Sequence, residues 1–190
     1  MPDYTLAPIT PLGGESPRID SFDGLTITEN PGLALASLAC RLGKEPEFAT
    51  LFKHRFGFDM PVAGQMLGKG DFAVFSTGLE QWFVEANIGQ HESLASDLAQ
   101  HFGPSASVTE QNDAWARFDV RGLAAPKVFE RLCALDVAVM TAGSASRSTI
   151  EHLGVYVLCR EAGENYSVLG PWSSAHSLHH ALVTTTKSAV

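Results

Sequence analysis

The chain has few cysteines, and their arrangement excludes a disulfide framework. Cys40, Cys133 and Cys159 are far apart in the 190-residue sequence, and each lies among apolar residues. This pattern is typical of reduced thiols that pack as small hydrophobic side chains. A chain of this length buries about 70% of its unfolded surface, so its core needs neither a disulfide nor a metal. We therefore expect reduced thiols and a cytoplasmic protein.

Positive charge is also scarce. The chain has 13 Lys and Arg against 21 Asp and Glu, a formal net charge of -8. Binding to DNA or RNA through the phosphates depends on Lys and Arg, so nucleic acid is excluded as a main partner. No apolar run approaches the roughly 20 residues of a membrane helix, and no basic N-terminal region precedes one. We expect a protein that is neither exported nor membrane-spanning, and its charged content of 18% leaves surface for protein partners.

Motifs of nucleotide and hydrolase chemistry are missing. Gly64, Gly68 and Gly70 form a loose glycine-rich stretch, but no strand followed by GxGxxG opens a helix. Ser107 and Ser144 lie in no Gly-x-Ser-x-Gly turn. The glycines are interpreted as a connection and the serines as turn residues, so we predict no dinucleotide site and no nucleophile in this chain.

Three histidines near the C-terminus are the first candidates for a metal site. His176 and His180 are four residues apart and share a helix face, whereas His179 points elsewhere. The Glu of the zinc-protease pattern HExxH is absent, and no Cys lies nearby. Glu151 and His152 are neighbours on a strand and point to opposite faces, which disfavours an acid-base pair. We predict no metal ligand, cofactor-binding residue or catalytic residue in this chain.

The residues that are present predict an α+β protein. Prolines and glycines in short order, Pro8, Pro11, Gly13, Gly14 and Pro17, indicate an extended N-terminal arm over residues 1–22. Apolar spacing, helix-ending glycines and turn signals then predict the elements of a first half, 23–110: a strand at 25–29, helices at 30–42, 48–56 and 91–102, and strands at 71–76 and 81–86.

The second half, 111–190, repeats this theme. It is predicted to contain a strand from Trp115, a helix over 125–135, strands near 148–153, 155–160 and 165–169, and a helix from Ser173. We expect two fused split βαβ, ferredoxin-like halves with mixed or antiparallel sheet, or one compact unit of the same elements.

One strand has an unusual outward face. Ala116, Phe118 and Val120 alternate on the face that packs inward, which leaves Trp115, Arg117, Asp119 and Arg121 on the other. Trp172 stands at a helix start. Aromatic residues beside arginines are typical of protein interfaces. We predict that a partner covers five interface candidates, Trp115, Arg117, Asp119, Arg121 and Trp172, and that the strand face is solvent-exposed in the isolated chain.

Three segments, AWARFDVRG, VFERLCALDV and RSTIEHLG, occur in the order and at roughly the spacing seen in one family. With the opening and closing segments, they make nearly the whole chain resemble the gamma subunit of heterotetrameric sarcosine oxidase. VFERLCALDV and the elements after it also resemble the folate-binding module of glycine-cleavage aminomethyltransferases. Those enzymes are longer, and this chain lacks their catalytic half.

The resemblance implies a non-catalytic accessory subunit with alpha, beta and delta partners. In that family the complex oxidatively demethylates sarcosine to glycine, transfers the methyl carbon to tetrahydrofolate and passes electrons through FMN and FAD to oxygen, which yields hydrogen peroxide. NAD and folate are associated with the alpha subunit, the flavins with beta and zinc with delta, so the gamma chain is expected to bind none of them. Three alternatives remain: the equivalent subunit of an N-methyl amino acid dehydrogenase, a free-standing folate-binding one-carbon transfer protein, and an unrelated scaffold.

Overall fold

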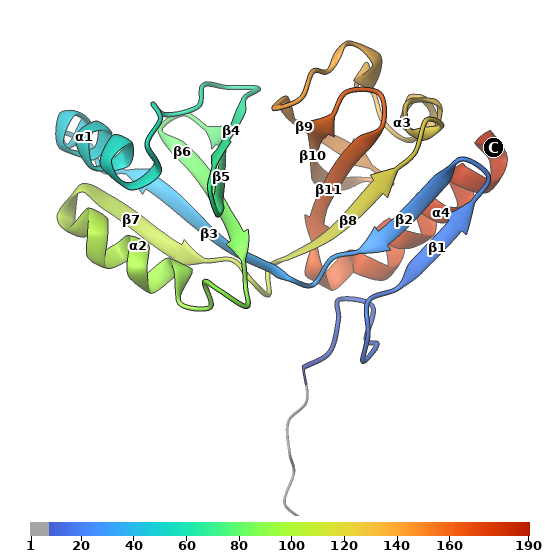
Figure 1. Ribbon diagram of the computed structural model, residues 1–190, viewed down its shortest axis with the longest axis horizontal. Helices are drawn as coiled ribbons and strands as arrows, with labels where there is room; N and C mark the ends of the chain where they lie inside the picture. Colours follow the sequence, from blue (N-terminus) through green and yellow to red (C-terminus); the bar gives the residue numbers. More distant parts are fainter. Residues whose placement is uncertain (1–7) are drawn as a thin grey trace, which may run out of the picture.

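Two antiparallel sheets face each other in the computed structural model, which describes residues 8–190 (Figure 1). The larger sheet has the order β1-β2-β8-β11-β10-β9, with bounds Ile19–Phe22, Leu25–Glu29, Trp115–Arg121, Asn165–Pro171, Leu153–Glu161 and Ala145–Ile150. The smaller sheet has the order β4-β5-β6-β3-β7, with bounds Met66–Lys69, Phe72–Gly78, Gln81–Asn87, Leu33–Cys40 and Ala106–Glu110. The α+β class expected from the sequence is confirmed.

Helices cover the outer face of each sheet. The smaller sheet carries α1 (Glu45–Phe56) and α2 (Leu94–Phe102), and the larger carries α3 (Ala125–Leu132) and α4 (Ala175–Ala189). Short 3-10 turns, η1, η2 and η3, occupy Gly103–Ser105, Val137–Val139 and Trp172–Ser174. Within residues 8–190, no helix has both the length and the apolar character needed to cross a membrane.

The two halves share one strand order. The order β4-β5-β6-β3-β7 in the smaller sheet corresponds position by position to β9-β10-β11-β8-β2 in the larger sheet. The third strand of each order, β6 or β11, is followed in the chain by an α-helix, α2 or α4. In the first half, β7 follows α2 and the short turn η1, and it pairs with β3. In the second half the strand in the matching place is β2, from the N-terminal hairpin, which pairs with β8 from Thr26↔Arg121 to Glu29↔Phe118.

This pairing corrects the predicted membership of strand 25–29. We had placed it in the first half because it precedes that half in the chain, whereas the hairpin β1-β2 belongs to the sheet of the second half. The physical reason is the free side of β8, since β11 covers only the other side. When β2 pairs there, the N–H and C=O groups on that side of β8 form hydrogen bonds. The order of the elements along the chain does not predict this pairing.

The helix predicted over 30–42 is wrong, because this segment forms the strand β3. Ala34, Ala36 and Leu38 are buried on the side of the helices, and Leu33 and Leu35 are buried on the side of the other sheet. A strand covered on both faces has a nearly continuous apolar run, which periodicity alone cannot distinguish from a buried helix.

Most other predicted elements are confirmed within a few residues. The helix α1 buries Phe48, Phe52 and Phe56 and ends at Gly57, whose φ of 74° is the left-handed conformation that favours glycine. The hairpin β5-β6 is present, but its turn lies at Leu79-Glu80. The helix predicted from His91 begins at Leu94, and the helix predicted to reach residue 135 ends at Leu132.

The predicted arm at 1–22 is only partly described, because residues 1–7 lie outside the described residues. From Thr10 the chain lies on its own second half, and it becomes strand β1 at Ile19. Glu29, which is 2% exposed, accepts hydrogen bonds from the backbone N–H groups of Leu12 (2.7 Å) and Arg18 (2.9 Å). This carboxylate fixes the arm to the start of the hairpin.

A third apolar core lies between the sheets, which we call the seam. Its buried residues come from both halves, and they are Leu33, Leu35, Phe75, Phe83, Ala145, Tyr156, Leu158 and Leu169. Phe75 and Phe83 each meet Tyr156 edge to face, with ring centroids 5.5 and 5.7 Å apart. A bridge between Gln65 and Ser144 also joins the sheets at their edges. The second face of each sheet is therefore covered largely by the other sheet of the same chain.

Candidate functional site

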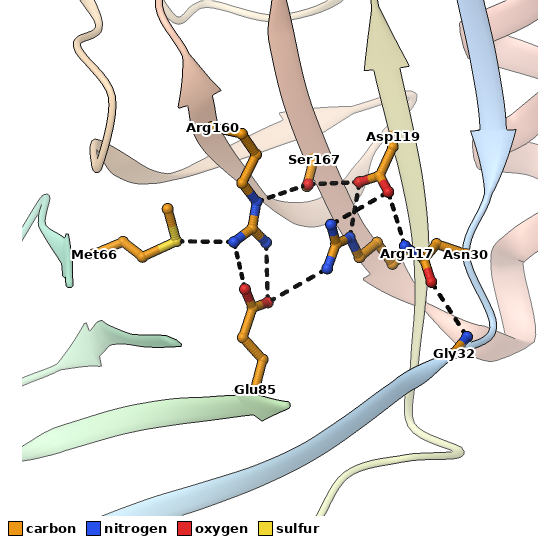
Figure 2. Close-up of polar contacts among 8 residues, drawn as sticks. All are labelled: Asn30, Gly32, Met66, Glu85, Arg117, Asp119, Arg160 and Ser167. Atoms are coloured by element: carbon orange, nitrogen blue, oxygen red, sulfur yellow. Dashed lines mark hydrogen bonds and ion pairs between the residues drawn. The ribbon is translucent and has the colours of Figure 1, made fainter. Parts of the chain in front are cut away.

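Beside its apolar residues the seam contains a network of four charged and two neutral polar side chains (Figure 2), which we call the seam network: Asn30, Glu85, Arg117, Asp119, Arg160 and Ser167. Glu85 is on β6 of the smaller sheet and is 4% exposed. It accepts hydrogen bonds from both terminal nitrogens of Arg160 on β10, one of them at 3.0 Å. The Arg117 guanidinium on β8 lies 3.9 Å from the same carboxylate. Glu85 thus holds two arginines of the opposite sheet.

Asp119 is the second acid of the network. It accepts hydrogen bonds from Arg117 Nε at 2.8 Å, from the Ser167 hydroxyl at 2.6 Å and from Asn30 Nδ2 at 2.8 Å. Burial alone raises the pKa of Asp119, but the charge of Arg117 and these hydrogen bonds outweigh it and hold the pKa below its usual value. Asp119 is therefore ionised in the folded chain.

The arginines are held in the same way. Burial lowers the pKa of Arg117, but the charges of Glu85 and Asp119 outweigh this and raise its pKa. Arg160, which is paired with Glu85, also donates from Nε to the Ser167 hydroxyl at 2.9 Å, and this hydroxyl donates to Asp119. Arg160 and Ser167 therefore connect the two acids. Two cations and two anions balance, and every carboxylate oxygen accepts at least one hydrogen bond. The arrangement suits a charge-neutral lock between the sheets.

A cavity of about 480 Å³ adjoins this network. Asn30, Glu85 and Arg117 form its wall on the network side. Its remaining walls come from the β4-β5 turn and from the ends of β3 and β6, and include Lys69, Asp71, Phe72 and Asn87. The lining is mainly polar and combines amides with charges of both signs. Such walls suit a polar ligand that can donate and accept hydrogen bonds.

The structure places three of the predicted interface residues in the seam. Arg117 and Asp119 are 17% and 21% exposed, and Trp115 is half-buried with its ring 5.5 Å from Phe83 and 5.4 Å from Tyr156. The prediction that this strand face is exposed in the isolated chain is therefore wrong. The cause is the smaller sheet of the same chain, which covers the face that we assigned to a partner.

The other two candidates lie outside the seam. Arg121 is exposed at the end of β8, and Trp172 is half-buried at the start of η3, where its backbone N–H donates to the Ala114 carbonyl at 2.9 Å. Among residues 8–190, neither side chain takes part in the hydrogen bonds of the seam network. Contact of Arg121 and Trp172 with another subunit stays a prediction.

The histidines of α4 differ in their hydrogen-bond partners, although they lie close together. His179 Nε2 lies 2.7 Å from Asp20 on β1, and the side chain of Arg18 also bonds this carboxylate at 3.0 Å. The hydrogen bond from Arg18 is the main cause that lowers the pKa of Asp20. His176, His179 and His180 all line an open depression with Glu151. In the part of the chain that the structure describes, no three His, Cys, Asp or Glu side chains are grouped as a metal site.

Sequence reasoning missed four members of the seam network: Asn30, Glu85, Arg160 and Ser167. Two of them carry a usable signal. Glu85 follows Trp82, Phe83 and Val84 in an apolar strand, and Arg160 closes the run VYVLC. A charge on the buried face of a strand needs a partner of opposite charge. Asn30 and Ser167 carry no comparable signal, because their role depends on how the sheets meet.

Comparison with solved structures identifies the fold. A chain of the heterotetrameric sarcosine oxidase from Corynebacterium sp. U-96, solved with pyrrole 2-carboxylate, superposes with a TM-score of 0.74 over 86% of this chain and 84% of that chain, at 18% sequence identity. This chain has the fold of that sarcosine oxidase chain. The likeness to sarcosine oxidase that the sequence motifs suggested is thus confirmed at the level of the fold.

The sarcosine oxidase-like fold has a second match. Glycine cleavage system aminomethyltransferase T from Bartonella henselae superposes with a TM-score of 0.62 at 12% identity, over 82% of this chain and 44% of that chain. This agrees with the remote likeness to an aminomethyltransferase module. No protein-family model matches the sequence, and no curated protein matches it.

Proposed function

We propose that the chain is a non-catalytic, gamma-type subunit of a heterotetrameric sarcosine oxidase. The observation that carries the proposal is the reciprocal extent of the structural match: 86% of this chain superposes on 84% of the oxidase chain, but on only 44% of the aminomethyltransferase. A chain of the same extent fits a corresponding subunit better than it fits a fragment of a one-chain enzyme. The three sequence motifs 114–122, 128–137 and 147–154 support the same assignment.

The seam network supports the non-catalytic part of the proposal. A general base needs a free lone pair aimed at the substrate, and an acid with a proton to give needs a raised pKa. The oxygens of Glu85 and Asp119 accept hydrogen bonds within the chain, and the pKa of Asp119 is lowered. The charged residues at the centre of the fold therefore act on each other and hold the two sheets together.

In the proposed complex the reactive groups belong to the alpha, beta and delta chains. FAD, FMN, NAD, tetrahydrofolate and zinc are held there, and the complex converts sarcosine to glycine with transfer of the methyl carbon to tetrahydrofolate and release of hydrogen peroxide. This chain supplies a rigid support, since each sheet is covered on both faces and the charges of the seam are paired.

Co-expression tests the proposal. The chain is produced with candidate alpha, beta and delta subunits from its native source, and the same three are produced without it. We expect equimolar co-elution of the four chains and peroxide release from sarcosine, with at least about a tenfold loss of assembled enzyme when this chain is omitted. Assembly and activity that do not depend on the chain would contradict the proposal, as would turnover of sarcosine by the chain alone.

The same preparation distinguishes a sarcosine oxidase from a related N-methyl amino acid dehydrogenase. The assembled complex is compared on sarcosine and on other N-methyl amino acids, with oxygen and with an artificial electron acceptor. A complex that prefers another N-methyl amino acid, or that does not reduce oxygen, would assign the chain to the dehydrogenase.

A second candidate function, binding of folate by the isolated chain, is favoured by two observations. The fold superposes on an aminomethyltransferase, and a polar cavity of about 480 Å³ lies next to the seam. Equilibrium dialysis of the purified chain with tetrahydrofolate tests it, with Asn87→Ala as a variant of the cavity wall and Asn165→Ala on the larger sheet as the control. Binding that Asn87→Ala weakens and Asn165→Ala leaves unchanged would support this candidate. Absence of binding at about 100 μM folate would reject it.

A further inference from the structure

A second hollow between the two sheets lies apart from the cavity beside the seam network. It has a volume of about 350 Å³, and the two share no lining residue. The cavity adjoins the start of β5 at Phe72, whereas this hollow adjoins the end of β5 at Thr77 and Gly78. The opposite wall holds Arg147 of β9 and Tyr156 of β10. We call this place the edge hollow, because β9 is an edge strand of the larger sheet.

Backbone hydrogen bonds hold the walls of the edge hollow in place. The N–H of Ala145 donates to the Gly64 carbonyl at 2.9 Å and so joins the two halves of the chain beside the hollow. The N–H of Ser76 donates to the Gln65 carbonyl at 3.3 Å. Gly64, Ser76 and Ala145 all line the hollow. The space is therefore preformed, as is usual for sites that bind small molecules.

Arg147 is the only charged residue, among those that the structure describes, that lines the edge hollow. It stands directly opposite Tyr156 in the antiparallel pair β9-β10, so both side chains lie on the same face of the sheet. Tyr156 belongs to the apolar core of the seam. Arg147 is therefore on the seam side of its strand, at the rim of that core.

The guanidinium of Arg147 differs from the other arginines on this face. Arg117 and Arg160 are paired with the acids Glu85 and Asp119. Within residues 8–190, Arg147 forms neither an ion pair nor a side-chain hydrogen bond, and no acid lines the hollow. A chain with a formal net charge of -8 thus presents an unpaired cation at a place that acids avoid.

The hydroxyl of Tyr156 adds a neutral donor next to this cation. Tyr156 is 7% exposed, and its ring packs against Phe75 and Phe83. Among residues 8–190, the only buried side-chain polar atom without a hydrogen-bond partner is His91 Nε2, so the Tyr156 hydroxyl, which has no partner either, is accessible. Burial raises the pKa of Tyr156, and the charge of Arg147 offsets part of this rise. The phenol is therefore protonated at neutral pH and can donate.

We propose that the edge hollow binds a small organic carboxylate, with Arg147 and Tyr156 as its donors. The planar fork of a guanidinium matches the geometry of a carboxylate. One cation balances the single charge of a carboxylate, whereas a phosphate group carries about 1.5 to 2 negative charges at neutral pH. Ala63, Leu135 and Ala145 provide apolar wall for the carbon body of the ligand. The hollow therefore favours an amphipathic monocarboxylate over an inorganic anion.

Titration of the full chain with benzoate, followed in amide NMR spectra, tests the proposal. Because Arg147 is exposed, water and salt weaken its charge, and we expect a dissociation constant of about 1 mM at low salt. The shifts should concentrate at residues 63–64, 76–78 and 145–147. Benzamide has the same shape without the charge and should bind at least about tenfold more weakly, and inorganic phosphate should also bind more weakly than benzoate.

Three results of this titration would overturn the proposal. They are the absence of saturable shifts at these residues up to about 20 mM benzoate, equal binding of benzamide, and tighter binding of phosphate than of benzoate.

Variants of the two donors provide a second measurement. Arg147→Gln should raise the dissociation constant for benzoate at least about tenfold, and Tyr156→Phe, which keeps the ring, should raise it about threefold. Arg121→Gln is the matched control, because Arg121 is also exposed and lies outside the hollow. The dispersion of the same spectra shows whether each variant is folded. Binding that Arg147→Gln leaves unchanged, or that Arg121→Gln weakens equally, would contradict the assigned donors. The hollow lies within this chain, so the outcome is independent of whether the chain assembles with oxidase subunits.

Discussion

The first half of the molecule is complete within its own stretch of chain, and the second half is not. From β3 to β7 the smaller sheet forms from consecutive elements. The larger sheet uses strands between Trp115 and Pro171 but takes the strand next to β8 from Leu25–Glu29. Two halves with the same strand order thus differ in how their last strand is supplied. The comparison teaches that strand order describes this fold better than chain order does.

The difference has an energetic side as well. In the first half the sheet is continuous in sequence, so its stability depends on local packing around Phe48, Phe52 and Trp82. In the second half a distant hairpin must dock, and its contacts with β8 and α4 carry that cost. We therefore expect substitutions in the hairpin and in the seam to lower the free energy of unfolding more than a reading of the sequence alone suggests.

The largest expected effect breaks the docking of the hairpin. Gly122 follows β8 with a φ of 137°, and a Cβ there would lie 2.1 Å from the Gly24 carbonyl oxygen. Both the backbone clash and the unfavourable φ oppose a side chain. We expect Gly122→Ala to lower the free energy of unfolding by about 3–5 kcal/mol, measured by urea denaturation.

Gly24→Ala is the matched control on the other side of this contact. Gly24 also has a positive φ, 70°, but a Cβ there has open space. Its substitution should cost about 1–2 kcal/mol from backbone strain alone. Equal losses for the two variants would show that the close approach of β8 to the hairpin turn does not matter.

The second effect separates the two sheets. Glu85→Gln removes the carboxylate that holds Arg117 and Arg160 and leaves two cations in the seam without their shared partner. We expect a loss of about 2–4 kcal/mol in the free energy of unfolding. The surface variant Glu47→Gln, whose carboxylate pairs with an exposed Lys44, should change it by less than about 0.5 kcal/mol. Similar values for both variants would contradict a locking role for Glu85.

The third effect is the pH dependence of stability that Asp119 contributes. The pKa of Asp119 is lowered in the folded chain, so its ionised form contributes stability that is fully present above about pH 4, near the unfolded pKa, and is lost as pH falls through the folded pKa. Asp119→Asn should cost about 1–3 kcal/mol at pH 7.

Urea unfolding of both proteins at several pH values checks this sign. The difference between the native chain and Asp119→Asn should be constant from about pH 5 to 7 and should shrink below about pH 4. A difference that grows as the pH falls would mean that Asp119 is protonated in the folded chain.

The smallest effect concerns the N-terminal arm. Glu29→Gln keeps the size of the side chain but replaces one of two carboxylate acceptors by an amide donor facing the N–H groups of Leu12 and Arg18. We expect a loss of about 1 kcal/mol. Hydrogen exchange should accelerate at these two amides and remain unchanged in β3. Unchanged exchange at Leu12 would show that Glu29 does not fix the arm.

Local patterns predicted most elements but not their assembly. The phenylalanines of α1, the glycine that ends it and the alternation in β8 each follow from neighbouring residues, and the structure confirms them. The strand β3 was missed because burial on both faces removes the alternation that reveals a strand. The hairpin was assigned to the wrong half because its partner β8 lies far along the chain.

The candidate site shows the same limit. The alternation of Trp115, Arg117 and Asp119 predicted a face for another subunit, but the smaller sheet of the same chain covers it. A single sequence shows that such a face needs a partner and does not show which surface supplies it. Glu85 and Arg160 could have been paired only by supposing that their two strands face each other.

The pairing of β2 with the distant strand β8 also determines when these strands can meet during synthesis. The hairpin β1-β2 leaves the ribosome first, yet β8, the strand that it pairs with, is made only after the whole first half. The first half can fold meanwhile, and the hairpin must wait with an unpaired edge. Closure of this long-range pairing should therefore be the slow step of folding, and translation that stalls before residue 115 should leave a nascent chain prone to aggregation.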